Sequence, residues 1–282
     1  MSIRDPQISV RRVRHWRHDR EGRRDREDVV AVEEPMEIRL VVEGQSGWTS
    51  VLVTMRTPGD DAELAVGFLY AEGILRDPAD LLAVLPCPSH KGDEANIVKV
   101  VLREGLEDRF DPRARNFYAS SACGVCGKAS LEQLRDEGRE AVSSPIEISP
   151  EGIAALPERF RKAQAAFDAT GGLHAAGLFT AAGELLLLRE DVGRHNAVDK
   201  IVGERFMDRA LPLTGNILMV SGRVSYEIVQ KAVAAGIPIL CAVGAPSSLA
   251  IDLAREFGVT LVGFLRGPRF NVYAHEGRIA LR

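Results

Sequence analysis

The sequence predicts an α/β protein, α+β overall, in which a larger carboxy-terminal domain follows a smaller amino-terminal α+β domain. The last third of the chain alternates between apolar, strand-like runs and helical runs that end at glycine. Such a β-α-β-α-β run is typical of parallel strands joined by right-handed crossovers. The expected strands span residues 216–220, 237–243 and 259–265, with helices at 225–235 and 246–257 between them.

The amino-terminal domain is predicted from a hairpin signal, two β-rich segments joined by Gly-Gln-Ser-Gly. A helix and a further strand follow, and Asp77 and Pro78 are suited to the N-cap and first position of a short helix. Helical sequence with a break at Pro157 then leads into a second hairpin. The segments are strands at 36–43, 48–56 and 96–103, helices at 61–71 and 149–170, and the hairpin strands 175–180 and 185–189.

Charge is distributed unevenly along the chain. The net charge is −4, which argues against a general nucleic-acid binder, but residues 1–28 contain nine Arg and six Asp or Glu, a net charge of +3. This arm has few apolar residues and no helical or strand period, so it is predicted to be disordered. A role in docking anionic partners is a secondary hypothesis.

No apolar core follows the charged start, and no apolar run approaches the roughly 18 residues of a membrane span. The chain is therefore expected to be cytoplasmic, without a membrane partner. The predicted organisation is a disordered Arg-rich arm at 1–28, an α+β domain at 29–115, a cysteine loop with a short helix and linker at 116–148, and the larger domain at 149–282.

The loops that follow the three predicted parallel strands suggest an anion site. Parallel strands place their carboxyl ends at one edge of a sheet, where α/β proteins bind ligands. Small residues permit close backbone approach, two of the loops contain Arg, and the adjacent helix amino termini attract anions. Neither a Gly-x-Gly-x-x-Gly nor a Walker sequence occurs. The three loops are Ser221-Gly222-Arg223, Gly244-Ala245-Pro246-Ser247-Ser248 and Arg266-Gly267-Pro268-Arg269.

The four cysteines are too few for a disulfide scaffold. Cys241 lies in an apolar run and is expected to be buried, and Cys87 is expected to lie in a loop without a role. Cys123 and Cys126 form a Cys-x-x-Cys pair, in which the thiol pKa falls from about 8.5 toward neutrality. Spacing alone leaves three alternatives: half of a zinc site completed by His174 and His195, a thioredoxin-like dithiol, or a sulfur carrier.

Five ordered motifs make the chain similar to the FdhD/NarQ family, the formate dehydrogenase accessory sulfurtransferases, over roughly residues 30–275. They are Cys-Gly-Val-Cys-Gly at 123–127, Gly-Gly-Leu-His-Ala-Ala at 171–176, Arg-Glu-Asp-Val-Gly-Arg-His-Asn-Ala-Val-Asp-Lys at 189–200, Ser-Gly-Arg at 221–223 with Glu227 and Lys231, and Gly-Phe-Leu-Arg-Gly at 263–267 with 269–273.

The resemblance implies a sulfur carrier that takes sulfur from a cysteine desulfurase and delivers it to the molybdenum bis(guanine dinucleotide) cofactor, as a bound substrate, for formate dehydrogenase. It also implies a carboxy-terminal three-layer domain similar to cytidine deaminases, but the deaminase zinc signature is missing, so deamination is not expected. The expected partners are the desulfurase, the formate dehydrogenase catalytic subunit and a second copy in a homodimer. No tightly held metal is expected.

By the same resemblance Cys123 carries the persulfide and residues 264–269 bind the cofactor. The other roles are interpretations of the residues themselves, and Cys126 tunes Cys123 or relays sulfur. Arg223 is a second phosphate contact, and His195 either transfers protons or has a structural role, whereas His174 is expected to be structural. Two rival functions stay open: a non-catalytic chaperone that inserts the cofactor, and a zinc-stabilised binding module. The expected cofactor-binding residues are Phe264, Leu265, Arg266, Gly267, Pro268 and Arg269, together with Ser221, Gly222, Arg223 and His195.

Overall fold

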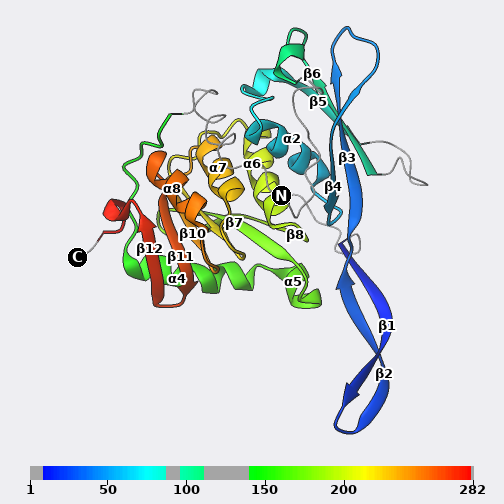
Figure 1. Ribbon diagram of the computed structural model, residues 1–282, viewed down its shortest axis with the longest axis vertical. Helices are drawn as coiled ribbons and strands as arrows, with labels where there is room; N and C mark the ends of the chain where they lie inside the picture. The colour runs from blue at the N-terminus through cyan, green and yellow to red at the C-terminus, as the bar shows by residue number, and fades with distance from the viewer. Residues whose placement is uncertain (1–8, 87–95, 111–139, 281–282) are drawn as a thin grey trace.

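The computed structural model describes residues 9–86, 96–110 and 140–280, which form a mixed α/β protein with three sheets (Figure 1). The α/β class is confirmed, whereas the likeness to cytidine deaminases stays a prediction. No helix of the described residues combines the length and apolar character needed to cross a membrane. The α-helices of the described residues are α2 (Asp61–Ala71), α4 (Pro150–Lys162), α5 (Ala165–Thr170), α6 (Arg194–Met207), α7 (Tyr226–Ala234) and α8 (Ser248–Glu256).

The largest sheet has six strands in the order β12-β11-β10-β9-β7-β8. Strands β9, β10 and β11 are parallel, as the β-α-β-α-β run predicts, and most of their side chains are buried. Outside this run β7 pairs antiparallel with β9 and β8, and β12 pairs antiparallel with β11. The strands are β7 (His174–Thr180), β8 (Leu185–Asp191), β9 (Asn216–Val220), β10 (Ile239–Ala242), β11 (Thr260–Arg266) and β12 (Arg269–Ala274).

Helices cover both faces of this sheet. On one face α4 buries Ile153, Leu156 and Phe160 against the sheet residues Phe179 and Met219. This apolar face explains why α4 continues through Pro157, where the sequence predicts a break: packing offsets the roughly 3 kcal/mol that an internal proline costs. On the other face α6, α7 and α8 share a core with α2 and the second sheet.

The second sheet has four strands in the order β4-β3-β6-β5, with α2 between it and α6. The hairpin, helix and strand that the sequence predicts here are confirmed, and the helix after Asp77 is a single 3-10 turn capped by that side chain. The edge strand β5 was not predicted. The strands are β3 (Glu34–Val42), β4 (Thr49–Arg56), β5 (Leu81–Pro86) and β6 (Ile97–Leu102).

The Arg-rich arm is the clearest difference from the sequence prediction. Disorder is expected for residues 1–28, but β1 (Val10–Asp19) and β2 (Gly22–Ala31) form an antiparallel hairpin that extends away from the body in Figure 1. The prediction of disorder rested on amino-acid composition, which indicates how much side-chain surface can be buried. This hairpin is stabilised instead by a backbone ladder of ten residue pairs and by packing of its base near α5. The prediction of disorder is therefore wrong for residues 10–28.

Candidate anion-binding site

The loops that follow β9, β10 and β11 are hydrogen-bonded to one another. The Gly244 N–H donates to the Gly222 carbonyl at 3.1 Å, and the Phe264 N–H donates to the Gly244 carbonyl at 3.1 Å. A Cβ on Gly244 would lie 2.7 Å from the Gly222 oxygen, so only glycine permits this approach. The convergence of the three loops at one edge of the sheet, predicted from the sequence, is confirmed.

A cavity of about 350 Å³ opens between these loops and the start of α6. Its lining contains three guanidinium groups and no carboxylate among the described residues. The Arg194 Nε atom is buried and has no hydrogen-bond partner in the described part of the chain, which is an unusual state for a polar atom. An anion is the ligand that this lining favours. The lining residues are His174, Arg194, Ser221, Gly222, Arg223, Val243, Gly244 and Arg266.

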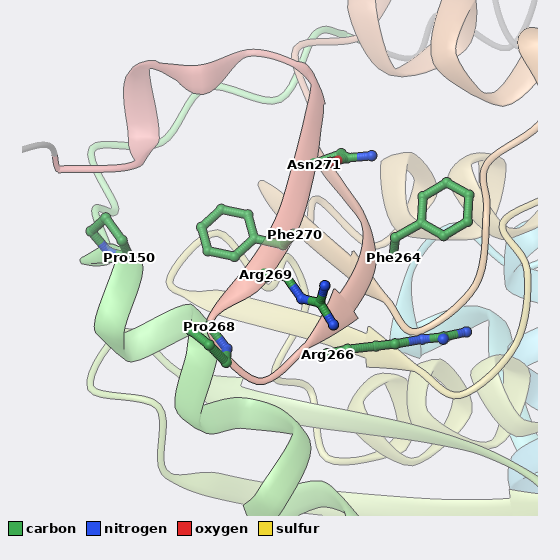
Figure 2. Close-up of a pocket in the computed structure, with 7 residues that line it drawn as sticks. All are labelled: Pro150, Phe264, Arg266, Pro268, Arg269, Phe270 and Asn271. Atoms are coloured by element: carbon green, nitrogen blue, oxygen red, sulfur yellow. The ribbon is translucent and has the colours of Figure 1, made fainter.

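A second, more open cavity of about 770 Å³ lies beside the β11–β12 hairpin and shares Arg266 with the first. Figure 2 shows Arg266, Arg269 and Phe264 extending toward one side of the hairpin, with Phe270 and Pro150 on the other side. The two cavities thus place four arginine side chains along one edge of the sheet. The lining of the larger cavity consists of Pro150, Phe264, Arg266, Pro268, Arg269, Phe270 and Asn271.

Phe264 has an unusual backbone conformation for its residue type. Its φ is +53°, and it lies in an irregularity of the β11–β12 pairing between Gly263 and Arg266. The ring is 44% exposed, whereas the next residue, Leu265, is 1% exposed and packs in the core. Non-glycine residues in this region cost about 1–3 kcal/mol and concentrate at functional sites. The irregularity therefore points an aromatic ring into the cavity.

The predicted cofactor-binding residues do not all line a cavity. Ser221, Gly222 and Arg223 line the smaller one, and Phe264, Arg266, Pro268 and Arg269 line the larger one. Leu265 faces the core instead, and Gly267, with φ +56°, forms the turn between β11 and β12. His195 lies outside both linings.

Arg194 is the main lining residue that the sequence analysis missed. It is the first residue of α6, whose N-cap is Gly193, so the positive end of a 14-residue helix meets the cavity. Asp191 holds this turn, because its Oδ1 accepts from the Gly193 N–H at 2.8 Å and from Asn196 Nδ2 at 2.9 Å. The motif around Asp191 was a signal for this role, because its polar residues come directly before a helix.

The same turn is fastened to the loop between β4 and α2. The buried carboxylate of Asp191 lies 2.8 Å from Lys200 Nζ and accepts from the Thr57 N–H, while the Thr57 hydroxyl accepts from the Val192 N–H at 3.1 Å. Lys200 Nζ also donates to the Thr57 carbonyl at 3.1 Å. Loop 57–60 therefore fixes the segment that presents Arg194.

His195 belongs to a separate hydrogen-bonded group beneath the site. Its Nε2 lies 2.9 Å from Ser225 Oγ, and its Nδ1 lies 3.5 Å from a Glu227 carboxylate oxygen. Burial, followed by the charges of Lys231 and Arg194, lowers the pKa of His195 to about 3. The ring is thus neutral at pH 7, and its polar contacts orient Ser225 at the start of α7.

His174 lines the smaller cavity as a neutral group as well. Its Nδ1 lies 3.4 Å from Ser221 Oγ, and Ser221 in turn accepts from the Ala175 N–H. Burial, and then the charge of Arg194, lowers the pKa of His174 below its ordinary value. The positive charge of the cavity therefore comes from its arginines.

Comparison with known proteins places the chain in a family. The model of the FdhD/NarQ family matches residues 31–280. The chain belongs to the FdhD/NarQ family.

Relatives in this FdhD/NarQ family align with nearly the whole chain. A sulfur carrier protein FdhD of Streptomyces avermitilis is 52% identical over 91% of this chain and 91% of its own length. One of Sulfurisphaera tokodaii is 44% identical over 96% of this chain and 100% of its own length. The crystal structure of a formate dehydrogenase accessory protein from Desulfotalea psychrophila matches with a TM-score of 0.74 and 25% identity, covering 96% of this chain and 100% of that one.

The Cys-x-x-Cys pair of this FdhD/NarQ chain, Cys123 and Cys126, lies outside the described residues, as do Cys87 and the short helix that the sequence predicts after the cysteine loop, near 128–137. Cys241 is fully buried, as predicted, and burial raises the pKa of its thiol to about 12. Among the described residues no group of three or more His, Cys, Asp or Glu side chains could hold a metal ion. His174 and His195, the proposed zinc ligands, are both engaged with serine hydroxyls.

Proposed function

We propose that this chain is a sulfurtransferase that acts as a sulfur carrier. It accepts sulfur from a cysteine desulfurase as a persulfide on Cys123. It then transfers that sulfur to the molybdenum bis(guanine dinucleotide) cofactor, which it binds as a substrate. Formate dehydrogenase requires this step for activity, and its catalytic subunit is the second partner.

The observation that carries the proposal is the smaller cavity with its carboxylate-free lining. Arg194, Arg223 and Arg266 supply three guanidinium groups there, and the buried Nε of Arg194 has no protein partner in the described residues. Guanidinium groups bind phosphate oxygens in a bidentate manner, so a ligand with pyrophosphate groups suits the cavity. The family membership and the names of the relatives support the sulfur chemistry.

The two cavities suit the two kinds of group in such a substrate. Arg266 lines both cavities, so one ligand can extend from the smaller cavity into the larger, more open one. In the open cavity the exposed ring of Phe264 offers an apolar face to a planar heterocycle, while Arg269 supplies further positive charge. The backbone N–H groups at the start of α6 add a favourable dipole for phosphate.

The sulfur steps are thiol–disulfide chemistry on Cys123. The Cys123 thiolate attacks the outer sulfur of the donor persulfide, the S–S bond of the donor breaks, and the donor cysteine leaves as a thiolate. Cys123 then holds the outer sulfur as its own persulfide. At the substrate this S–S bond breaks, Cys123 leaves as a thiolate, and the outer sulfur bonds to the molybdenum, whose two-electron oxidation reduces that sulfur to sulfide. Cys126 lowers the pKa of the Cys123 thiol or receives the sulfur in relay.

Intact-mass spectrometry tests the first half of the proposal. After incubation with a cysteine desulfurase and free cysteine, the wild-type protein and Cys126→Ala should each gain the mass of one sulfur atom, and Cys123→Ala should not. A wild-type protein that never gains sulfur would instead favour the non-catalytic chaperone. Stoichiometric zinc lost on replacing either cysteine would favour the zinc-stabilised binding module.

Guanosine diphosphate binding tests the second half. The wild-type protein should bind this nucleotide, and Arg266→Ala should weaken binding roughly tenfold or more, the value of one lost charge-assisted contact. Arg103→Ala is the control, because Arg103 is exposed and lies outside both cavities. Equal affinities of Arg266→Ala and wild type would contradict the placement of the substrate.

A further inference from the structure

The β1–β2 hairpin is an ordered arm whose surface the proposed sulfur chemistry does not use. It extends from the body in Figure 1, and most of its side chains are exposed. Residues 10–31 contain eight Arg and five Asp or Glu, a net charge of +3, which leaves −7 on the rest of the chain. An isolated two-stranded hairpin is marginally stable in water, so this arm is suited to docking on another surface.

The strand register divides the arm into two faces. Pairs such as Arg14↔Glu27 and Trp16↔Asp25 lie on one face, and Arg17↔Arg24 lies on the other, because alternate residues of a strand point to opposite sides. On the first face two arginines have a carboxylate partner: Arg14 lies 3.7 Å from Glu27, and Arg23 lies 3.9 Å from Asp25. The ring of Trp16, 55% exposed, is covered by an arginine of that same face.

The second face is not matched in this way. Arg17 is directly opposite Arg24, and His15 is directly opposite Arg26; we call these four residues the basic face. Like charges directly opposite each other destabilise an antiparallel pair. Glu21 forms an ion pair with Arg24, but within the described residues Arg17 and Arg26 have no carboxylate partner.

We propose that the basic face docks on a carboxylate-rich surface of a partner protein. The unfavourable Arg17↔Arg24 pair becomes favourable once carboxylates lie against both side chains. Arginine forks bind carboxylates in a bidentate manner, and arginine is enriched at protein interfaces. The inference is independent of the sulfur chemistry.

A protein partner fits the charges better than a nucleic acid does. Acidic side chains alternate with the arginines along β2, Asp19 ends β1, and the rest of the chain has a charge of −7, so a long phosphate backbone would meet repulsion beside the basic face. A protein surface with a local group of carboxylates would not extend to those acidic residues.

The test measures binding of the full-length protein to a dye-labelled peptide of alternating Glu and Ser by fluorescence anisotropy. Arg17→Glu changes the basic face, and Arg12→Glu makes the same change of charge on the other face of the same strand. We expect Arg17→Glu to weaken binding about tenfold or more. Arg12→Glu should stay within about twofold of wild type, and binding should weaken as salt is added.

A loss of peptide binding by Arg17→Glu would not be due to unfolding of the hairpin. The substitution places opposite charges directly across the two strands, so the melting temperature of the variant should not fall. Three results would overturn the inference. One is an equal loss of peptide binding in both variants. Another is tighter binding of an oligonucleotide of the same length through the same face. The third is self-association of the wild type that Arg17→Glu abolishes, which would make a second copy the occupant.

Discussion

Gly67 of α2 and Gly203 of α6 lie against each other's helix backbone where the two helices cross. A Cβ on Gly67 would be 1.9 Å from the Asp199 carbonyl oxygen, and a Cβ on Gly203 would be 1.9 Å from the Glu63 carbonyl oxygen. The crossing thus places the backbones of the two helices in direct contact. It joins α2, which packs on the four-stranded sheet, to the helix whose first residue, Arg194, lines the smaller cavity.

Replacing Gly203 with Ala should destabilise the whole chain. The added methyl group meets backbone atoms that cannot move independently, so the helices must separate, and we expect a loss of about 1–3 kcal/mol or more in the free energy of unfolding. Gly215→Ala is the control, because a Cβ there meets nothing within 4 Å. Denaturant titration measures both variants, and equal midpoints would contradict the close crossing.

Replacing Lys200 with Met should be far more costly than the same change at an exposed lysine. Lys200 is 1% exposed and pairs with the fully buried Asp191, so its loss leaves a buried carboxylate without its cation. A loss of about 3–5 kcal/mol in the free energy of unfolding is expected. Lys162→Met removes an exposed pair with Glu158 and should cost at most about 1 kcal/mol. Similar losses in the two variants would refute this role of Lys200.

His195 should make the protein less stable in acid. Its pKa is about 3 in the folded chain, below the ordinary value of 6.5, so between these values the unfolded chain binds a proton that the folded chain does not. The free energy of unfolding therefore falls as the pH decreases from 6.5 toward 3. Above pH 6.5 His195 does not destabilise the folded chain in this way. Urea titrations at several pH values should show a smaller decline in His195→Gln than in wild type. His18→Gln, at an exposed position, should behave as wild type. If the stability of His195→Gln declined as steeply with falling pH as that of wild type, His195 would not be the source of the acid sensitivity.

Phe264→Gly should separate stability from binding. Glycine adopts a φ of +53° without cost, so the melting temperature should stay the same or rise. Affinity for guanosine diphosphate should fall, because a stacked aromatic ring contributes about 1–3 kcal/mol to base binding. Calorimetry measures both quantities. A variant that melts lower and binds as tightly as wild type would show that the ring is a packing residue.

The carboxy-terminal fold could be predicted because its local signals agree with its packing. The helices α7 and α8 end close to Gly236 and Gly258, both of which have positive φ, and strand β10 between them is apolar throughout because both faces of the sheet are covered. The hairpin arm could not be predicted from composition. Its order rests on backbone hydrogen bonds between β1 and β2, and these bonds depend little on which side chains the strands carry.

The candidate site could be predicted in part. The three loops were identified because parallel strands end at one edge, but the sequence did not show that Leu265 faces the core while Phe264 faces the cavity. That alternation is set by the irregular pairing of β11 with β12, which no local pattern indicates. Arg194 was missed because it joins the loops only through the packing of α6 and through the turn before it, where the Val192 N–H donates to the Thr57 hydroxyl and the Gly193 N–H donates to Asp191.

The most direct test of the account follows radiolabelled sulfur from Cys123 to the substrate. The protein is loaded by a desulfurase with labelled cysteine, separated from the donor, and incubated with the molybdenum bis(guanine dinucleotide) cofactor. We predict that label leaves the wild-type protein for the cofactor, that Arg266→Ala retains most of its label, and that Cys123→Ala is never labelled. Transfer from Arg266→Ala at the wild-type rate, or full labelling of Cys123→Ala, would contradict the account.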